Sequence, residues 1–177
     1  MQRWRLDRRA SPLGVLTIVS DETGRLRALD FDDCDARMRR LLGLHYGTVD
    51  LADAPSPLPL RDVLDRYFAG ETGALQTVPV ATGGTPFQRT VWSALRALPP
   101  GRTCSYGQLA AAIGRPGTGR AVGLANGTNP IAIVVPCHRV IGADGTLTGY
   151  AGGLWRKRWL LSHEAPDQGL LAGPIRS

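Results

Sequence analysis

The chain has 177 residues, of which 43% are hydrophobic and 20% charged, with 22 glycines and 13 prolines. This composition is typical of one globular domain or two small ones, and it excludes a wholly disordered chain, a collagen and a coiled coil. No apolar run approaches the roughly 18 residues of a membrane-spanning helix, and we expect no secretory signal and no membrane partner. Three widely spaced cysteines without a CxxC pair favour a reducing cytoplasm over a disulfide framework.

Charge is distributed unevenly along the chain. Residues 1–85 hold 11 arginines against 12 acidic residues, whereas residues 86–177 hold nine arginines and one lysine against three acids. A half of net charge −1 followed by a half of net charge +7 indicates a surface on the second half that faces a polyanion, nucleic acid first. A basic surface that serves only solubility is an equal alternative. Composition also changes near residue 85, and we therefore predict domains 1–85 and 86–177.

The first half has the pattern of a small α/β unit. Two apolar runs, 13–20 and 25–31, flank an Asp-Glu-Thr-Gly turn and predict a β-hairpin. Apolar residues at helical spacing predict helices over 33–46 and 60–69, each ended by a glycine. The segment before residue 85 is predicted to be a linker with a short strand at 77–80.

The second half begins with three predicted helices. Thr85-Pro86 is a strong helix start, and the helix is expected to run to about Leu98. A second helix over 105–113 and a third over 118–126 are separated by a Gly-Arg-Pro-Gly turn. Two short helices across such a turn in a basic domain form a helix-turn-helix pattern, although this pattern also arises often by chance.

The third predicted helix carries small residues and one arginine. Gly119, Ala121, Gly123 and Ala125 are interpreted as a face that allows close approach to a nucleic-acid groove, with Arg120 among them. Tight packing against another helix is the alternative for the same small residues.

Cys137 and His138 are candidates for nucleophilic catalysis. A cysteine beside a histidine, preceded by proline and followed by arginine, is an environment that favours a thiolate nucleophile. Because adjacent side chains diverge, we expect His138 to act through a bridging water. Glu164, at the end of a predicted helix over 154–163, is the acid chosen to orient it; His163 is a rival base but cannot easily face its own neighbour. A buried structural Cys-His pair remains open.

The segment after the cysteine predicts a turn and a ligand wall. Apolar runs at 140–141 and 146–150 around an Asp-Gly pair predict a second hairpin. The Gly-Tyr-Ala-Gly-Gly segment at 149–153 offers an aromatic side chain and several backbone amides to a planar ligand. A glycine-rich linker would look the same.

Together these motifs resemble the methylated-DNA–protein-cysteine methyltransferases, also called O6-alkylguanine-DNA alkyltransferases, of the bacterial stand-alone type. The resemblance is dense over about 85–165 and is carried by PCHRV at 136–140, RAVG at 120–123, Asn129-Pro130, GYAGG at 149–153, Lys157 and His163-Glu164. It implies an α/β (α+β) protein: a small N-terminal α/β domain with an antiparallel sheet, and a mainly helical C-terminal domain with a helix-turn-helix and the active-site cysteine.

The resemblance also implies an activity. The protein would bind double-stranded DNA through the minor groove, flip out the damaged base and transfer the alkyl group of O6-alkylguanine, and of O4-alkylthymine, irreversibly to Cys137. One molecule would act once, as a cytoplasmic monomer with no cofactor and no metal. His138 would be the water-bridged base, oriented by Glu164.

Further contacts come with the same resemblance. Substrate contacts would be made by Tyr150, the amide of Ala151, the carbonyls of Cys137 and Val140, and Lys157. DNA contacts would be made by Arg120, which fills the stack after the nucleotide leaves, with Ala121, Gly123 and Tyr106. Tyr106 would also donate to guanine N3, and Asn129 would brace the turn before the acceptor.

The sequence departs from the family pattern at some positions, and two other classes of protein are alternatives. Ala151 stands where some members carry serine, so a hydroxyl bond to O6 is lost. The first half offers only Cys34 and His45 as soft ligands, and we predict no structural zinc there. A cysteine hydrolase, which needs an oxyanion hole and sustained turnover, is the main rival. A non-enzymatic lesion binder is the second rival, but in such alkyltransferase-like proteins the acceptor cysteine is replaced.

Overall fold

The computed structural model describes residues 1–168, which fall into two compact units. The first unit comprises Met1–Gly84 together with Pro130–Val134. The second comprises Thr85–Asn129 and, among the described residues, 135–168. No helix among the described residues is long and apolar enough to cross a membrane.

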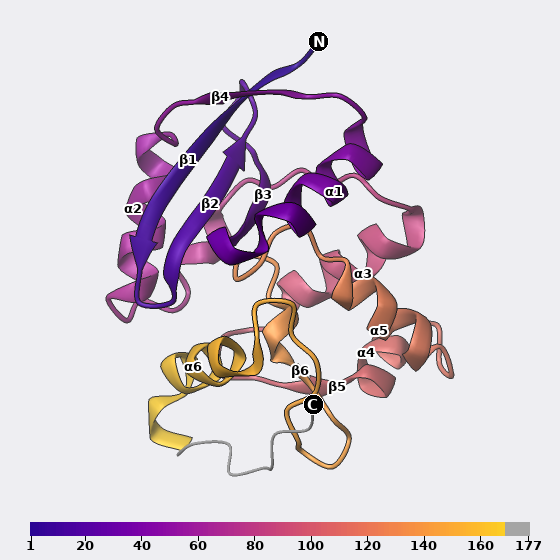
Figure 1. The fold of residues 1–177 in the computed structure, drawn as a ribbon. Coiled ribbons are helices and arrows are strands. Elements are labelled where there is room, and N and C mark those ends of the chain that lie inside the picture. Colours follow the sequence, from indigo (N-terminus) through magenta and orange to yellow (C-terminus); the bar gives the residue numbers. More distant parts are fainter. Residues whose placement is uncertain (169–177) are drawn as a thin grey trace. The chain divides into compact units, whose positions relative to one another are not determined.

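A four-stranded sheet forms the first unit, in the order β3-β2-β1-β4 (Figure 1). Its strands are β1 (Arg3–Ser11), β2 (Gly14–Ser20), β3 (Leu26–Phe31) and β4 (Asp50–Asp53). The pairs β1–β2 and β2–β3 are antiparallel, whereas β4 runs parallel to β1. The predicted hairpin is confirmed as β2–β3.

Strand β1 is not predicted by its own sequence. Only Trp4 and Leu6 of this arginine-rich segment are buried apolar side chains. The strand forms because Arg5–Ser11 pair with β2, which places Leu6 opposite Val19, while its first residues pair with β4. Cross-strand packing of this kind stabilises a strand whose local pattern is weak.

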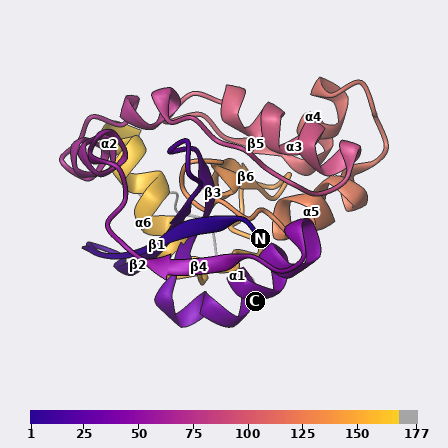
Figure 2. The same cartoon turned by 90° about the horizontal axis from the view of Figure 1, so that it is seen from above.

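Helices α1 (Asp35–Tyr46) and α2 (Leu58–Phe68) cover opposite faces of the sheet (Figure 2). Side chains of α1 form a buried apolar cluster with Leu6 on one face. On the other face, Arg9 forms an ion pair with Asp65 of α2 at 2.7 Å. Both helices were predicted within a few residues of these bounds.

The prediction of a strand at 77–80 is wrong. A 3-10 turn, η2 (Ala74–Thr77), occupies its start, and a second one, η1 (Asp32–Cys34), precedes α1. Only Val80 forms a bridge, with Leu26. Pro79 lacks the amide hydrogen that a ladder needs, so the pairing does not extend.

Segment 130–134 belongs to the first unit because backbone hydrogen bonds attach it there. Ala132 N donates to the carbonyl of Leu29 at 2.8 Å, and Leu29 forms a parallel bridge with Ile131. The chain then turns at Ile133, which has a φ of 69°, a backbone conformation that β-branched residues rarely adopt. The apolar run before the cysteine is therefore a bridge and a turn.

The second unit is mainly helical. It contains α3 (Pro86–Ala97), α4 (Tyr106–Ala112), α5 (Gly119–Gly127), α6 (Leu154–Glu164), the 3-10 turns η3 (Cys137–Arg139) and η4 (Pro166–Gln168), and two short parallel strands, β5 (Cys104–Ser105) and β6 (Val140–Ile141). Thr85 and Ser105 form capping boxes with Gln88 and Gln108, which explains why α3 and α4 begin where the sequence predicts.

The second predicted hairpin forms only its turn. Gly142 N donates to the carbonyl of Thr146 at 2.8 Å, and the Asp144 carboxylate accepts from the hydroxyl of Thr146 at 2.7 Å. Beyond this turn, the carbonyls of Thr148 and Gly149 accept from a lysine ammonium instead of a strand partner. Strand β6 pairs with β5, and not with the segment after the turn.

The small residues of α5 do not share one face, contrary to the prediction. Successive residues of an α-helix are rotated by about 100°, so a spacing of two places side chains on different sides. A Cβ atom on Gly119 or Gly123 would lie 3.7 or 3.6 Å from atoms at the start of α4. Ala125 is buried, whereas Ala121 is exposed. Both glycines therefore face α4, where a Cβ atom would make an ordinary van der Waals contact, and Ala121 remains on the surface.

Candidate active site

Turn η3 carries the candidate nucleophile, Cys137, followed by His138 and Arg139. In a 3-10 turn the side chains of successive residues leave the backbone about 120° apart, so those of Cys137 and His138 start in different directions. His138 is completely buried, whereas Cys137 is 8% exposed. Both residues are therefore buried, and Cys137 keeps a small exposed area.

Glu164, at the end of α6, lies against both residues that follow the cysteine. Its Oε1 is 2.8 Å from His138 Nε2 and accepts from Arg139 Nη2 at 2.9 Å, while its Oε2 accepts from Arg139 Nε at 2.9 Å. Burial alone would raise the pKa of Glu164, but the charge of His138 and the hydrogen bonds of both partners outweigh it and hold that pKa well below its usual range. The carboxylate is therefore ionised.

An ionised carboxylate accepts hydrogen bonds and donates none, and this determines the histidine tautomer. His138 Nε2 must carry the proton in its contact with Glu164. In neutral His138 the lone pair is then on Nδ1, which can take a proton. The pair has the geometry of a general base with an orienting acid.

Arg139 is a site residue for which the sequence predicts no role. Besides its two bonds to Glu164, it donates from Nη1 to the carbonyl of Leu98 at the end of α3. This contact ties the carboxylate to a second helix. The sequence does hold a signal for this role, because a buried glutamate needs a cationic partner and Arg139 is the cation next to His138 in the sequence.

Two asparagines hold the backbone around η3. Asn129 Nδ2 donates to the carbonyl of Val135 at 2.8 Å, and Asn126 Nδ2 donates to the carbonyl of Cys137 at 3.4 Å. Both asparagines are buried. Asn129 was named in advance, whereas Asn126 was not, since nothing in its local pattern distinguishes it from a helix-surface residue.

Lys157 of α6 is fully buried and binds backbone oxygens. Its Nζ donates to the carbonyls of Val140 and Thr148 at 2.6 Å each, and to that of Gly149 at 3.3 Å. Burial lowers the pKa of Lys157 to about 8, and the negative charge of the Cys137 thiolate opposes this shift. All three ammonium hydrogens are engaged, so Lys157 positions the chain on either side of the 142–146 turn.

Tyr106 brings helix α4 next to Thr148, the residue before the 149–153 segment that is predicted to line the pocket. Its hydroxyl lies 3.3 Å from Thr148 Oγ1, and its ring lies against Gly123 of α5. Tyr150, two residues after Thr148, is partly buried, and the next residue, Ala151, is exposed. Tyr106 thus links both helices of the helix-turn-helix to the 148–151 segment.

Helix α5 is anchored on its inner side and presents Arg120 on its outer side. Trp92 Nε1 of α3 donates to the carbonyl of Ala125 at 2.8 Å. Arg120 and Ala121, near the start of α5, are exposed. The exposed arginine is therefore carried by a helix that is fixed to the body of the unit.

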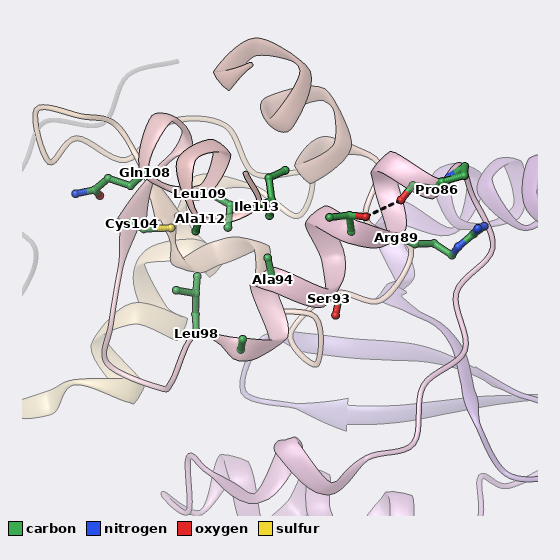
Figure 3. Close-up of a pocket in the computed structure, with 12 residues that line it drawn as sticks. Pro86, Arg89, Ser93, Ala94, Leu98, Cys104, Gln108, Leu109, Ala112 and Ile113 are labelled. Carbon is green, nitrogen blue, oxygen red and sulfur yellow. Dashed lines mark hydrogen bonds between the residues drawn. The ribbon is translucent and has the colours of Figure 1, made fainter. Parts of the chain in front are cut away.

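A cavity of about 840 Å³ lies between α3 and α4 (Figure 3). Arg89 and Gln108 lie at opposite ends of it, and Cys104 is among its lining residues. Cys137 does not line this cavity, which is consequently separate from the candidate nucleophile.

The second unit combines a helix-turn-helix with a cysteine that is followed by a buried His-Glu pair, a combination that defines a DNA-acting protein with a cysteine nucleophile. Comparison with known proteins supports the same class. The model of the ribonuclease-like domain of 6-O-methylguanine DNA methyltransferase matches residues 9–82, and the model of its DNA binding domain matches residues 86–166.

Relatives extend this match over most of the chain. A methylated-DNA–protein-cysteine methyltransferase of Salmonella typhimurium is 58% identical over 157 residues, which are 88% of this chain and 92% of the relative. The crystal structure of Mycobacterium tuberculosis OGT in complex with DNA has a TM-score of 0.77 at 42% identity and covers 92% of this chain and 93% of that one. The O6-methylguanine-DNA methyltransferase of Pyrococcus kodakaraensis has a TM-score of 0.69 at 29% identity, covering 92% and 99%.

The chain belongs to the methylated-DNA–protein-cysteine methyltransferase family. The predicted family and fold class are confirmed. So are the predicted function, DNA repair by alkyl transfer to a cysteine, and DNA as the partner.

Proposed function

We propose that the protein takes the alkyl group of O6-alkylguanine, and of O4-alkylthymine, from double-stranded DNA irreversibly onto Cys137. The observation that supports this most directly is the buried 2.8 Å contact between His138 and Glu164 directly after Cys137. Cys137 is the one cysteine that has such a base next to it in the sequence, since Cys34 and Cys104 have no neighbouring histidine. For this reason we assign the acceptor role to Cys137.

In the reaction, His138 would take the thiol proton of Cys137 through a bridging water. The thiolate sulfur would attack the alkyl carbon, and the C–S bond would form as the C–O6 bond breaks. The electron pair of the broken bond stays on the guanine, which must then regain a proton. A hydrogen bond from the Tyr106 hydroxyl to N3 would stabilise the departing base.

Charged and backbone groups around Cys137 would support this step. Glu164, held by Arg139, would keep His138 in the tautomer that accepts the proton. The buried ammonium of Lys157 would favour the thiolate electrostatically, and it would hold the carbonyl of Val140 towards the exocyclic amine of the base. Tyr150 and the amide of Ala151 would line the pocket near O6.

DNA would be bound through α4 and α5 in the minor groove. Arg120 would fill the stack left by the extruded nucleotide, with Ala121, Gly123 and Tyr106 close to the groove. Extrusion costs a few kcal/mol, which these contacts and the net charge of +7 on residues 86–177 would offset. Residues 1–85 would be a scaffold domain, and 86–177 the DNA-binding and acceptor domain.

The chemistry also implies how often the protein acts. A thioether has no easy hydrolysis route, unlike the thioester of a cysteine hydrolase, so each molecule would be consumed in one turnover. The cysteines, all thiols within the described residues, fit the cytoplasm as the place of action. The protein would work as a monomer without cofactor.

The test is the intact-protein mass after mixing with a slight excess of duplex that contains one O6-methylguanine, followed by peptide mapping. We expect one methyl group per chain, on the peptide with Cys137, and restored guanine without further turnover. Cys104→Ser should still be methylated. Sustained turnover with unchanged protein mass would indicate the hydrolase, and tight binding with unchanged mass the lesion binder.

A further inference from the structure

The exposed side of α5 is a single stripe. Its exposed residues are Arg120, Ala121, Leu124 and Gly127, whereas Val122, Ala125 and Asn126 are buried on the other side. Positions one, four and seven residues after Arg120 lie along one face of an α-helix. The stripe therefore holds one charged, two small and one large apolar residue.

Leu124 is the large apolar residue of this stripe, and it is 71% exposed. A single exposed leucine is common on protein surfaces and needs no explanation by itself. Its position is the informative feature: it lies one helical turn after Arg120, between the methyl group of Ala121 and the bare backbone of Gly127. A surface that follows the stripe can approach the helix backbone closely, and Leu124 is the apolar group that projects into it.

The spacing of this stripe matches the dimensions of DNA. Residues four apart on a helix have Cβ atoms about 5–6 Å apart, which is less than two base steps of about 3.4 Å each. The minor groove is about 6 Å wide, and proteins that bind it commonly insert an apolar side chain next to an opened base step. If Arg120 occupies the place of the extruded nucleotide, Leu124 lies at the adjoining steps.

We propose that Leu124 is a DNA-contacting residue that enters the minor groove beside Arg120, packs against the sugars next to the extruded nucleotide and stabilises the opened duplex. The inference rests on the proposed function. It assigns an apolar contact to the interface, in addition to the charged one of Arg120. Leu124 would stabilise the DNA with the nucleotide extruded, and it would not affect the chemistry at Cys137.

The test compares Leu124→Ala with the wild type in two reactions. Methyl transfer from an O6-methylguanine duplex should slow by roughly tenfold, as expected when a leucine side chain loses its burial in the complex. Reaction with free O6-benzylguanine base should be unchanged, because this substrate needs no extrusion. Leu124→Met, which keeps a long apolar side chain, should recover most of the duplex rate.

Leu58→Ala is the matched control, since Leu58 of α2 is also 71% exposed. It should leave both rates unchanged. Equal slowing of both reactions by Leu124→Ala would overturn the proposal in favour of a structural role, and unchanged rates in both would overturn it too. An altered oligomeric state with an unchanged duplex rate would mean that a second copy covers Leu124, which also refutes it. A wild type that fails to react with either substrate would instead refute the proposed function.

Discussion

Replacing Arg139 by methionine removes the cation that holds the buried Glu164. In the native protein the Glu164 carboxylate takes part in three hydrogen bonds, two of them from Arg139 at 2.9 Å each. The substitution keeps an apolar stem of similar length but leaves an ionised, buried group with His138 as its remaining partner. The carbonyl of Leu98 also loses its donor.

The expected loss follows from that burial. Removing one partner of a buried ion pair costs about 3–5 kcal/mol, a large part of the roughly 5–15 kcal/mol that stabilises a domain. The measurement is urea denaturation, followed by tryptophan fluorescence and circular dichroism. Arg66→Met is the control: Arg66 also contacts a carboxylate through two nitrogens, in Glu71, but it is about half exposed, so the free energy of unfolding should hardly change.

A second substitution separates charge from packing. Adding Glu164→Gln to Arg139→Met replaces the unpaired buried carboxylate by a neutral amide. The double variant should therefore lose less unfolding free energy than the two single variants lose together. A loss below about 1 kcal/mol for Arg139→Met, or strictly additive losses, would refute the reasoning that the ion pair holds this site together.

Three further predictions test other parts of the molecule. Cys137→Ser should abolish methyl transfer and leave duplex affinity nearly unchanged, as measured by protein mass and fluorescence anisotropy; loss of both would make Cys137 structural. Arg120→Ala should slow repair of duplex far more than reaction with free alkylguanine base in stopped-flow assays, and equal losses would exclude the stack-filling role. Burial would raise the pKa of Asp21, but hydrogen bonds from Thr23, Arg25 and Arg27 lower it from 3.8 to about 2. The Asp21 carboxylate therefore stabilises the fold fully when the pH is above 3.8, and this stabilisation is lost as the pH falls towards 2. Asp21→Asn should therefore cost about 2 kcal/mol at pH 7 and almost nothing at pH 2, as seen by thermal denaturation across this range; a pH-independent cost would contradict the assignment.

Local signals in the sequence determined where several helices begin and which residues are candidates for chemistry. Thr85 and Ser105 satisfy backbone amides only three residues away, so α3 and α4 can be predicted from short segments. The β2–β3 hairpin likewise depends on its own turn. The Cys-His pair and its helix-turn-helix were visible because adjacent or closely spaced residues carry them.

Only the tertiary structure shows the roles of residues that are buried by distant segments of the chain. Arg139 gains its role from Glu164, which lies 25 residues further along the chain, and Lys157 gains its role from carbonyls of a loop that would otherwise continue as a strand. Strand β1 exists because β2 pairs with it, and the exposed side of α5 is known only once α3 and α4 cover the other. A side chain's chemistry is local, but its partners and its desolvation are set by packing between segments far apart in sequence. This is why the sequence by itself indicates Cys137, His138 and Glu164, but not the contacts of Arg139 and Asn126 that hold them in place.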